Sequence, residues 1–268
     1  MSGFSADWLA LREPFDRAAR NVAVLDAVVA ALKDLRQIRI VDLACGTGST
    51  LRALAPKLAA QQTWRLCDND LGLLLRASTM PLPVGITVTT TPLDLNRDLE
   101  AALDGPVDLV TTSALLDLVS KPWLDRLATE IAARKIPFYA ALSYDGRAEL
   151  APPDPRDAAI VKAVNTHQYN DKGFGPALGP LAASAAIERF EKLGYSVMRG
   201  QSDWLAGPRD REFQMEILNG WASAAREIGV QLADAVEWLT RRRDAVSAGR
   251  VSLRVGHVDF FAAPIGTR

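Results

Sequence analysis

The feature that most constrains the fold of this chain is a regular alternation of strand-like and helix-like segments between residues 38 and 144. Short apolar runs rich in β-branched residues predict strands at 38–44, 63–68, 85–94, 107–116 and 137–144. The spacing of apolar residues predicts helices at 49–60, with a kink or restart at Pro56, at 71–78 and at 122–135. Strands joined by helices usually lie parallel, with helices on both faces of the sheet. The sequence therefore predicts a doubly wound α/β fold.

The remaining segments predict additions to one domain that spans residues 1–268. Residues 1–37 are expected to be helical, with an amphipathic helix at 16–36. Three prolines shortly after Tyr144 indicate a loop that leaves the sheet. We expect further strands at 195–205 and 251–263 and further helices at 181–193, 208–229 and 231–247. Two elaborations, 145–180 and 206–249, begin at strand ends, where α/β proteins build their sites, and are predicted to form a substrate cap.

Composition excludes several classes of function. The formal net charge is −1, which gives no positive field for a nucleic-acid backbone. The two cysteines suit a reducing compartment, and no group of His, Cys or carboxylate residues has the spacing of a metal site. The sequence shows neither an apolar run of about 18 residues nor a secretion signal. We expect a cytoplasmic protein without a metal, with the formation of a homodimer left open.

A glycine-bearing turn follows the first predicted strand, within the segment RIVDLACGTGSTLRAL (39–54). Gly46 and Gly48 lack Cβ atoms, so backbone amides there can approach a ligand that also meets the N-terminus of the next helix. A dinucleotide-binding turn needs a small residue at its third glycine position, which is Leu51 here. The phosphate-binding pattern G-x-x-x-x-G-K-[ST] is absent. Both phosphate-based interpretations are therefore disfavoured.

The segment VDLACGTGS resembles the first motif of the class I S-adenosylmethionine (SAM)-dependent methyltransferases. Asp42 matches the acidic position of that motif, and Ala44, Gly46 and Gly48 match its small positions. The resemblance implies a Rossmann-like seven-stranded sheet in the order 3-2-1-4-5-7-6, with strand 7 antiparallel. It also implies that residues 38–144 form the SAM-binding core, in which the turn wraps the amino-acid end of the cofactor.

Three later segments match the family in the same order. Asp68 ends the second predicted strand, 22 residues after Gly46, where a carboxylate can accept hydrogen bonds from both ribose hydroxyls. The resemblance implies this role for Asp68, with Asn69 beside it. It further implies that Asp94 receives the adenine amino group and that Leu95 donates through its backbone.

The fourth predicted strand resembles the family motif that ends near the sulfonium, a position that Ser113 occupies here. Family members often reach the SAM carboxylate from the helix before the first strand, which Arg20 or Arg12 would do in this chain. Simpler explanations exist for each feature: a tight turn for the glycines, helix N-caps for Asp68 and Asp94, and solvation for Arg20. The order and spacing of all four motifs together favour SAM binding.

The residues that act on the methyl acceptor are less clearly marked. Candidates near the ends of the fourth and fifth predicted strands, or in the loops above them, are Asp117, Tyr144, Asp145, His167, Tyr169 and Asp171. His167, Asp117 and Tyr144 are our candidate catalytic residues, because a hydroxyl acceptor usually needs a general base. Capping of a helix is the simpler role for His167, and starting a helix for Asp117. His257 is expected on an exposed face of the last strand, without a role.

The best-supported function is methyl transfer to an N, O or C atom of a small molecule by in-line displacement. Two alternatives remain open. A nucleic-acid methyltransferase normally has a positive face, and the fourth strand of this chain ends in SALL rather than in an Asn/Asp-Pro-Pro-Tyr/Phe segment. The second alternative is a non-catalytic SAM-binding module, which the sequence does not exclude because the cofactor motifs are clear and the acceptor motifs are not.

Overall fold

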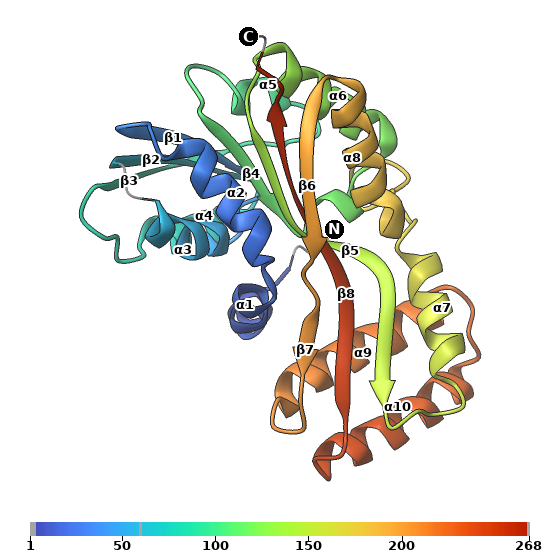
Figure 1. Cartoon of the computed structure of the whole chain (residues 1–268). Coiled ribbons are helices and arrows are strands. Elements are labelled where there is room, and N and C mark those ends of the chain that lie inside the picture. Colours follow the sequence, from blue (N-terminus) through green and yellow to red (C-terminus); the bar gives the residue numbers. More distant parts are fainter. Residues whose placement is uncertain (1–3, 59–60, 267–268) are drawn as a thin grey trace.

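The computed structural model describes residues 4–58 and 61–266, which are built around an open sheet (Figure 1). The strands are β1 (Gln37–Leu43), β2 (Gln61–Asp68), β3 (Ile86–Pro92), β4 (Leu109–Ser113), β5 (Phe138–Ala151), β6 (Tyr195–Gln201), β7 (Trp204–Ala206) and β8 (Ser252–Pro264). Their order is β3-β2-β1-β4-β5-β8-β6, and β7 pairs with β8 beside this path. Strands β1 to β5 pair in parallel, whereas β8 is antiparallel to β5 and β6. The predicted order is confirmed, with β8 as the seventh strand.

Helices cover both faces of this sheet. The helical elements are α1 (Ala6–Ala19), α2 (Val22–Leu32), α3 (Ser49–Leu54), η1 (Ala55–Lys57), α4 (Leu71–Ser78), α5 (Leu99–Ala102), η2 (Leu116–Leu118), α6 (Lys121–Ala133), α7 (Asp157–His167), η3 (Gly179–Leu181), α8 (Ala182–Lys192), α9 (Arg211–Glu227) and α10 (Leu232–Ser247). One apolar core joins α2, α3 and α4 to the sheet, and another joins α5, α6 and α8 to its opposite face. Because helices cover both faces, the central strands are buried almost throughout, as the predicted doubly wound fold requires.

Strands β5 and β8 continue well beyond the central sheet, toward the bottom of Figure 1. There they pair with each other, β7 pairs with β8, and α7, α9 and α10 pack against this extension. A third apolar core fills the space between them and includes Phe213, Trp238 and Leu253. The two predicted elaborations, 145–180 and 206–249, contribute most of the helices of this part.

Helix α1 connects this extension to the glycine turn. Trp8 stacks on Phe213 of α9, with ring centroids 5.8 Å apart, and meets Trp204 of β7 edge-on at 6.3 Å. On another side of the helix, Glu13 accepts two hydrogen bonds of 2.6 Å from Arg52 of α3. Aromatic contacts therefore hold α1 against the extension, and an ion pair holds it against α3.

The prediction of one helix over 16–36 is wrong. Helix α1 ends at Ala19, and Arg20 has an extended backbone with ψ of 130°. The guanidinium of Arg20 turns inward and donates to the Tyr139 hydroxyl at 3.1 Å, while the Asn21 side chain accepts from Val24 N and begins α2. Helical periodicity continues through this break because both helices bury an apolar face. The restart expected at Pro56 is confirmed by η1, and residues 59–60 of that predicted helix lie outside the described residues.

Two strand predictions also need correction. Strand β5 does not end at Tyr144 but continues to Ala151, because Arg147 pairs with Asp145 and Asp203 and so makes a charged sequence tolerable in a strand. The predicted strand 195–205 is interrupted at Ser202 and Asp203, where the Asp203 carboxylate accepts hydrogen bonds from Arg147 and Arg254. The sheet consequently has eight strands rather than seven.

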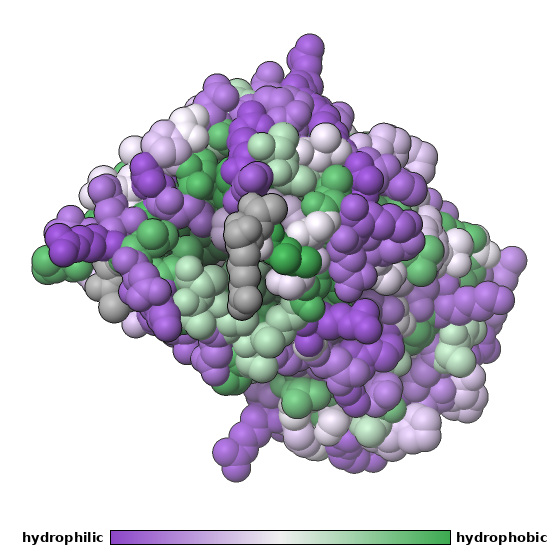
Figure 2. Space-filling view, turned by 45° about the horizontal axis from the view of Figure 1, so that its top comes forward, coloured by the Kyte–Doolittle hydropathy of each residue, from purple (hydrophilic) through white to green (hydrophobic). Residues whose placement is uncertain are grey.

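Hydrophilic side chains cover most of the face drawn in Figure 2, and smaller groups of apolar residues lie between them. Within residues 4–58 and 61–266, no helix is long and apolar enough to cross a membrane. The same residues contain no group of three or more His, Cys, Asp or Glu side chains arranged to hold a metal ion.

Candidate active site

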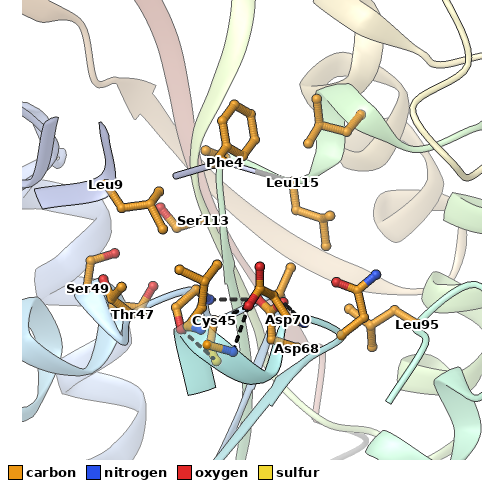
Figure 3. A pocket seen from close by; sticks show the side chains of 18 of the residues that line it. Phe4, Leu9, Cys45, Thr47, Ser49, Asp68, Asp70, Leu95, Ser113 and Leu115 are labelled. Carbon is orange, nitrogen blue, oxygen red and sulfur yellow. Dashed lines mark hydrogen bonds between the residues drawn. The ribbon is translucent and has the colours of Figure 1, made fainter. Parts of the chain in front are cut away.

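A cavity of about 730 Å³ lies beyond the carboxyl ends of β1, β2 and β4, beneath α1. This volume is within the range of about 300–1,000 Å³ that is usual for small-molecule sites. The predicted cofactor residues that line it are Ala44, Gly46, Asp68, Asn69, Asp94, Leu95 and Ser113. Figure 3 shows Phe4, Leu9 and Leu115 across the cavity from Asp68. Segments far apart in the sequence therefore meet at the edge of the sheet where such folds bind ligands.

The glycine turn forms one wall of the cavity. Gly46 and Gly48 have φ values of +54° and +82°, in the left-handed region that favours glycine. A Cβ atom on Gly46 would lie 3.2 Å from Leu9 Cδ1, so a side chain there would occupy the space between the turn and α1. Gly48 does not line the cavity; it begins α3. The turn thus provides bare backbone on the side of the cavity that faces Leu9 of α1.

Two alanines in the cavity wall adopt the same uncommon backbone conformation. Ala44 follows β1, Ala114 follows β4, and both have φ of 52°. Non-glycine residues with positive φ are uncommon and cluster at ligand sites, where the surrounding structure holds them. The backbone therefore adopts an unfavourable conformation just after each of the two central strands, β1 and β4. In both places the unfavourable residue lines the cavity.

Asp68 is fixed by its neighbours rather than by solvent. Its Oδ2 accepts from Gly46 N at 2.8 Å and its Oδ1 from Asp70 N at 3.0 Å. The N-cap of α4 is Asp70, which accepts from Gly72 N and Leu73 N, so the N-cap explanation for Asp68 is wrong. Each Asp68 oxygen retains acceptor capacity toward the cavity, as the binding of two adjacent hydroxyls requires.

Asp94 and Leu95 lie on the next loop, after β3. Asp94 is exposed and accepts from Asn96 N at 2.9 Å, in a turn before α5 rather than as its N-cap, which is Asp98. The Leu95 carbonyl accepts from Trp123 Nε1 at 2.8 Å. The hydrogen bond from Trp123 of α6 therefore fixes the backbone of Leu95, and the exposed Asp94 carboxylate lies next to this buried residue.

Asp42 lies beneath the cavity and does not line it. The side chain is fully buried, and Oδ1 accepts from the Thr111 hydroxyl at 2.8 Å. Burial raises the pKa of Asp42 to about 7. Its Oδ2 atom has no hydrogen-bond partner among the described residues. An uncompensated carboxylate oxygen beneath the turn creates a site that favours a nearby positive charge.

Arg20 is also buried beneath the cavity, so the expectation of a solvated side chain does not hold. Its Nη2 donates toward Ser113 Oγ at 3.4 Å and Thr50 Oγ1 at 3.5 Å, and both of these residues line the cavity. Arg20 therefore contributes a positive charge immediately behind the cavity wall rather than in it.

None of the three candidate catalytic residues lines the cavity in the described part of the chain. Asp117 is buried in η2 behind the wall, and burial raises its pKa to about 6. The Tyr144 hydroxyl donates to Asn165 Oδ1 at 2.7 Å. His167, at the end of α7, contacts Glu227 through Nε2 at 2.9 Å and Lys172 Nζ through Nδ1 at 3.3 Å. Of these contacts, only Lys172 reaches the cavity.

The remaining candidates are engaged elsewhere. Asp145 pairs with Arg147, Asp171 accepts from Gly173 N and Gly175 N, and Tyr169 is exposed. The exposed face expected for His257 is wrong: the side chain is buried 4.5 Å from the Trp204 ring, measured between ring centroids, and burial lowers its pKa to about 4. Periodicity implied a solvated face there because it does not show that β7 and its aromatic neighbours cover this part of β8.

Among the residues that α1 and the loop after α7 place in the cavity, the sequence pointed to Arg12 alone, as a possible partner of the SAM carboxylate. Leu9, Arg12 and Asp16 follow one another at steps of three and four along α1, and all three line the cavity. That spacing was visible in the sequence as one face of a helix, although its two charges made the face look solvated. Lys172 and Phe174 reach the wall from a loop held by a hydrogen bond from Asn96 Nδ2 to Gly173 O at 3.1 Å.

No protein-family model and no curated protein matches the chain. Among solved structures, the cyclopropane-fatty-acyl-phospholipid synthase-like protein from Lactobacillus casei is 14% identical, with a TM-score of 0.57 over 97% of this chain and 94% of that chain. The YcgJ protein from Bacillus subtilis is 12% identical, with a TM-score of 0.50 over 92% of this chain and 100% of that chain. A SAM-dependent methyltransferase from Geobacter sulfurreducens, in complex with S-adenosyl-L-homocysteine, is 15% identical and covers 99% of this chain and 100% of itself at a TM-score of 0.47.

The first two likenesses show a shared fold, and identities this low show nothing about activity. Together with the strand order and the antiparallel β8, they establish that the chain shares an open, Rossmann-like α/β fold with these two proteins.

Proposed function

We propose that the protein is a SAM-dependent methyltransferase that acts on a small molecule. The single observation that carries this proposal is the meeting of the glycine turn, Asp68 and Asp94 in one cavity of about 730 Å³. These groups match the three parts of an adenosyl amino acid: bare backbone for the methionyl part, a fixed carboxylate for the ribose, and a second carboxylate for the adenine amino group. The buried Arg20, whose guanidinium lies behind Ser113 and Thr50, supplies a positive charge on the side of the cavity proposed for the methionyl carboxylate.

The cofactor supplies a methyl group on a positively charged sulfur, which is displaced in line by the acceptor atom. The chain then has to hold that atom about 3 Å from the methyl carbon, opposite the sulfur. Ser113, the last residue of β4, and Leu115, just after it, lie in the wall where this alignment is needed. Helix α1 covers the cavity from above and restricts the acceptor to a small molecule. The three candidate catalytic residues, Asp117, Tyr144 and His167, do not line the cavity. We therefore assign them no direct contact with the acceptor.

Production of S-adenosyl-L-homocysteine tests the proposal. The pure protein, SAM labelled in its methyl group and a fractionated metabolite extract should yield a labelled small molecule and an equal amount of S-adenosyl-L-homocysteine. Label in RNA or DNA would instead indicate a nucleic-acid methyltransferase. Tight SAM binding with no product from any fraction would indicate a non-catalytic binding module.

A further inference from the structure

Two cations stand at one end of the cavity, which we call the β5 end and define by Phe4, Arg12, Asp16, Leu118 and Lys172. Several contacts place this end on the far side of the cavity from Asp68. Asp16 accepts from Trp204 Nε1 of β7 at 2.9 Å. The charges of Arg12 and Lys172 both act on Asp117, in η2 after β4. Arg12 and Lys172 thus both line the cavity, and both lie near the buried Asp117.

Arg12 is buried and incompletely partnered. Its residue exposure is 9%, and its Nε atom is buried without a hydrogen bond to any described residue. The one carboxylate within ion-pair distance in residues 4–58 and 61–266 belongs to Asp16, 3.2 Å from Nε. A guanidinium has five N–H donors in a planar fork, and a buried charged donor that stays unpaired is costly. The guanidinium carbon also lies 5.8 Å from the centroid of the Phe4 ring. The terminal amino groups make no hydrogen bond to a described residue, so they are available to a ligand in the cavity.

Lys172 offers a second donor at the same end. Its ammonium lies 3.3 Å from His167 Nδ1, and no carboxylate of the described chain is within ion-pair distance of it. His167 is held in turn by Glu227, so the lysine is positioned without being neutralised. The groups that face Lys172 are therefore His167, with Glu227 behind it, and the buried Asp117.

The rest of this end is apolar, since Phe4 and Leu118 line it and Leu115 lies next to it. The side chains that line it carry two positive charges and one negative charge, which leaves a single positive charge for a ligand. A carboxylate satisfies that charge and matches the planar fork of an arginine. A phosphate dianion would carry one more negative charge than this end balances.

We propose that Arg12 and Lys172 bind the carboxylate of the methyl acceptor, which is therefore a small carboxylic acid with an apolar body. That the bound molecule is the methyl acceptor rests on the proposed function, whereas the binding of a carboxylate at this end does not. The carboxylate anchors the molecule, and the apolar residues hold the part that carries the atom to be methylated.

Calorimetric titration tests this inference with benzoate and octanoate as probes and with benzamide and octanamide as uncharged controls. Each probe is added to the protein with and without saturating S-adenosyl-L-homocysteine. We expect at least one carboxylate to bind about tenfold or more tightly than its amide, because charge-assisted hydrogen bonds replace neutral ones. Arg12→Met and Lys172→Met should each remove most of that preference, and Arg17→Met, on the exposed side of the same helix, should leave it intact.

Equal binding of carboxylates and amides, or no binding of either carboxylate, would overturn the inference. So would an Arg12→Met protein that binds carboxylates normally but loses S-adenosyl-L-homocysteine, because Arg12 would then belong to the cofactor. If Arg12→Met does not fold, Arg12→Lys and Lys172→Met carry the test, since Lys172 lies in a loop. If the protein does not bind S-adenosyl-L-homocysteine, only the proposed function is refuted. The titrations carried out without this compound still measure carboxylate binding.

Discussion

The two ends of the cavity were built from very different stretches of sequence. The end around Asp68, which we call the β2 end, takes Gly46, Asp68, Asn69, Asp94 and Leu95 from the loops that follow three adjacent parallel strands. The β5 end takes its charges from α1 and from a loop more than a hundred residues later. A site made from consecutive strand ends leaves a pattern in the sequence, whereas a site made by long-range packing does not.

The largest effect is expected for Gly46→Val at the β2 end. A branched side chain would need the left-handed φ of +54° and would meet Leu9, so it should reduce S-adenosyl-L-homocysteine affinity by about a hundredfold or more. Gly220→Ala, on the exposed face of α9, is the matched control and should bind normally, with a stability gain of about 0.5–1 kcal/mol. Calorimetry and urea unfolding measure both effects. Normal binding by the valine variant would place the ligand elsewhere.

Asp68→Ala should come next, with a loss of about 1–3 kcal/mol in binding S-adenosyl-L-homocysteine, the scale for buried hydrogen-bond partners left unmade. The neighbouring Asp70→Asn is the comparison, because asparagine caps a helix as well as aspartate does and α4 should be retained. Its affinity should stay within about threefold of the parent protein. If the order of the two effects is reversed, Asp70 rather than Asp68 binds the ribose.

The pKa of Asp42 gives a stability prediction with a defined sign. Burial raises that pKa from 3.8 to about 7, so the folded state holds a proton that the unfolded state has released between these values. The free energy of unfolding therefore falls as pH rises from about 4 to 7, by up to about 1.4 kcal/mol per pH unit from this group.

Asp42→Asn removes this dependence, and its stability relative to the parent protein should rise over the same interval and level off above it. Urea unfolding at pH 5, 6, 7 and 8 measures the difference. Asp26→Asn, on the exposed side of α2, is the control and should show a constant difference. A flat difference for Asp42→Asn would mean that Asp42 is already ionised at pH 5.

The smallest effect concerns the attachment of α1, which supplies the β5 end. Glu13→Gln weakens the ion pair with Arg52 and should cost about 0.5–1 kcal/mol or less, since both side chains are partly exposed. We expect the change mainly as a faster release of S-adenosyl-L-homocysteine in stopped flow, by a few fold. Glu212→Gln, exposed at the start of α9, is the control. An unchanged release rate would show that the aromatic contacts of Trp8 alone hold the helix.

The sequence was informative wherever local rules decide the structure. Strand order followed from helical crossovers and the motif resemblance. Asp68 could be placed because it ends a strand, and Asp94 because the resemblance marked the segment just after the next strand. It was misleading where a partner far along the chain decides. Asp203 made residues 145–151 a strand, Tyr139 drew Arg20 into the core, and Trp204 covered His257. Lys172 stayed unnoticed for the same reason, and Arg12 was considered only as a partner of the SAM carboxylate.

A crystal structure of the protein with S-adenosyl-L-homocysteine tests the central claim most directly. The account predicts ribose hydroxyls on Asp68, the adenine amino group at Asp94 and the homocysteine sulfur directed toward the β5 end. Density for the compound outside this cavity, or a nicotinamide dinucleotide that displaces it from the same residues, would contradict the account.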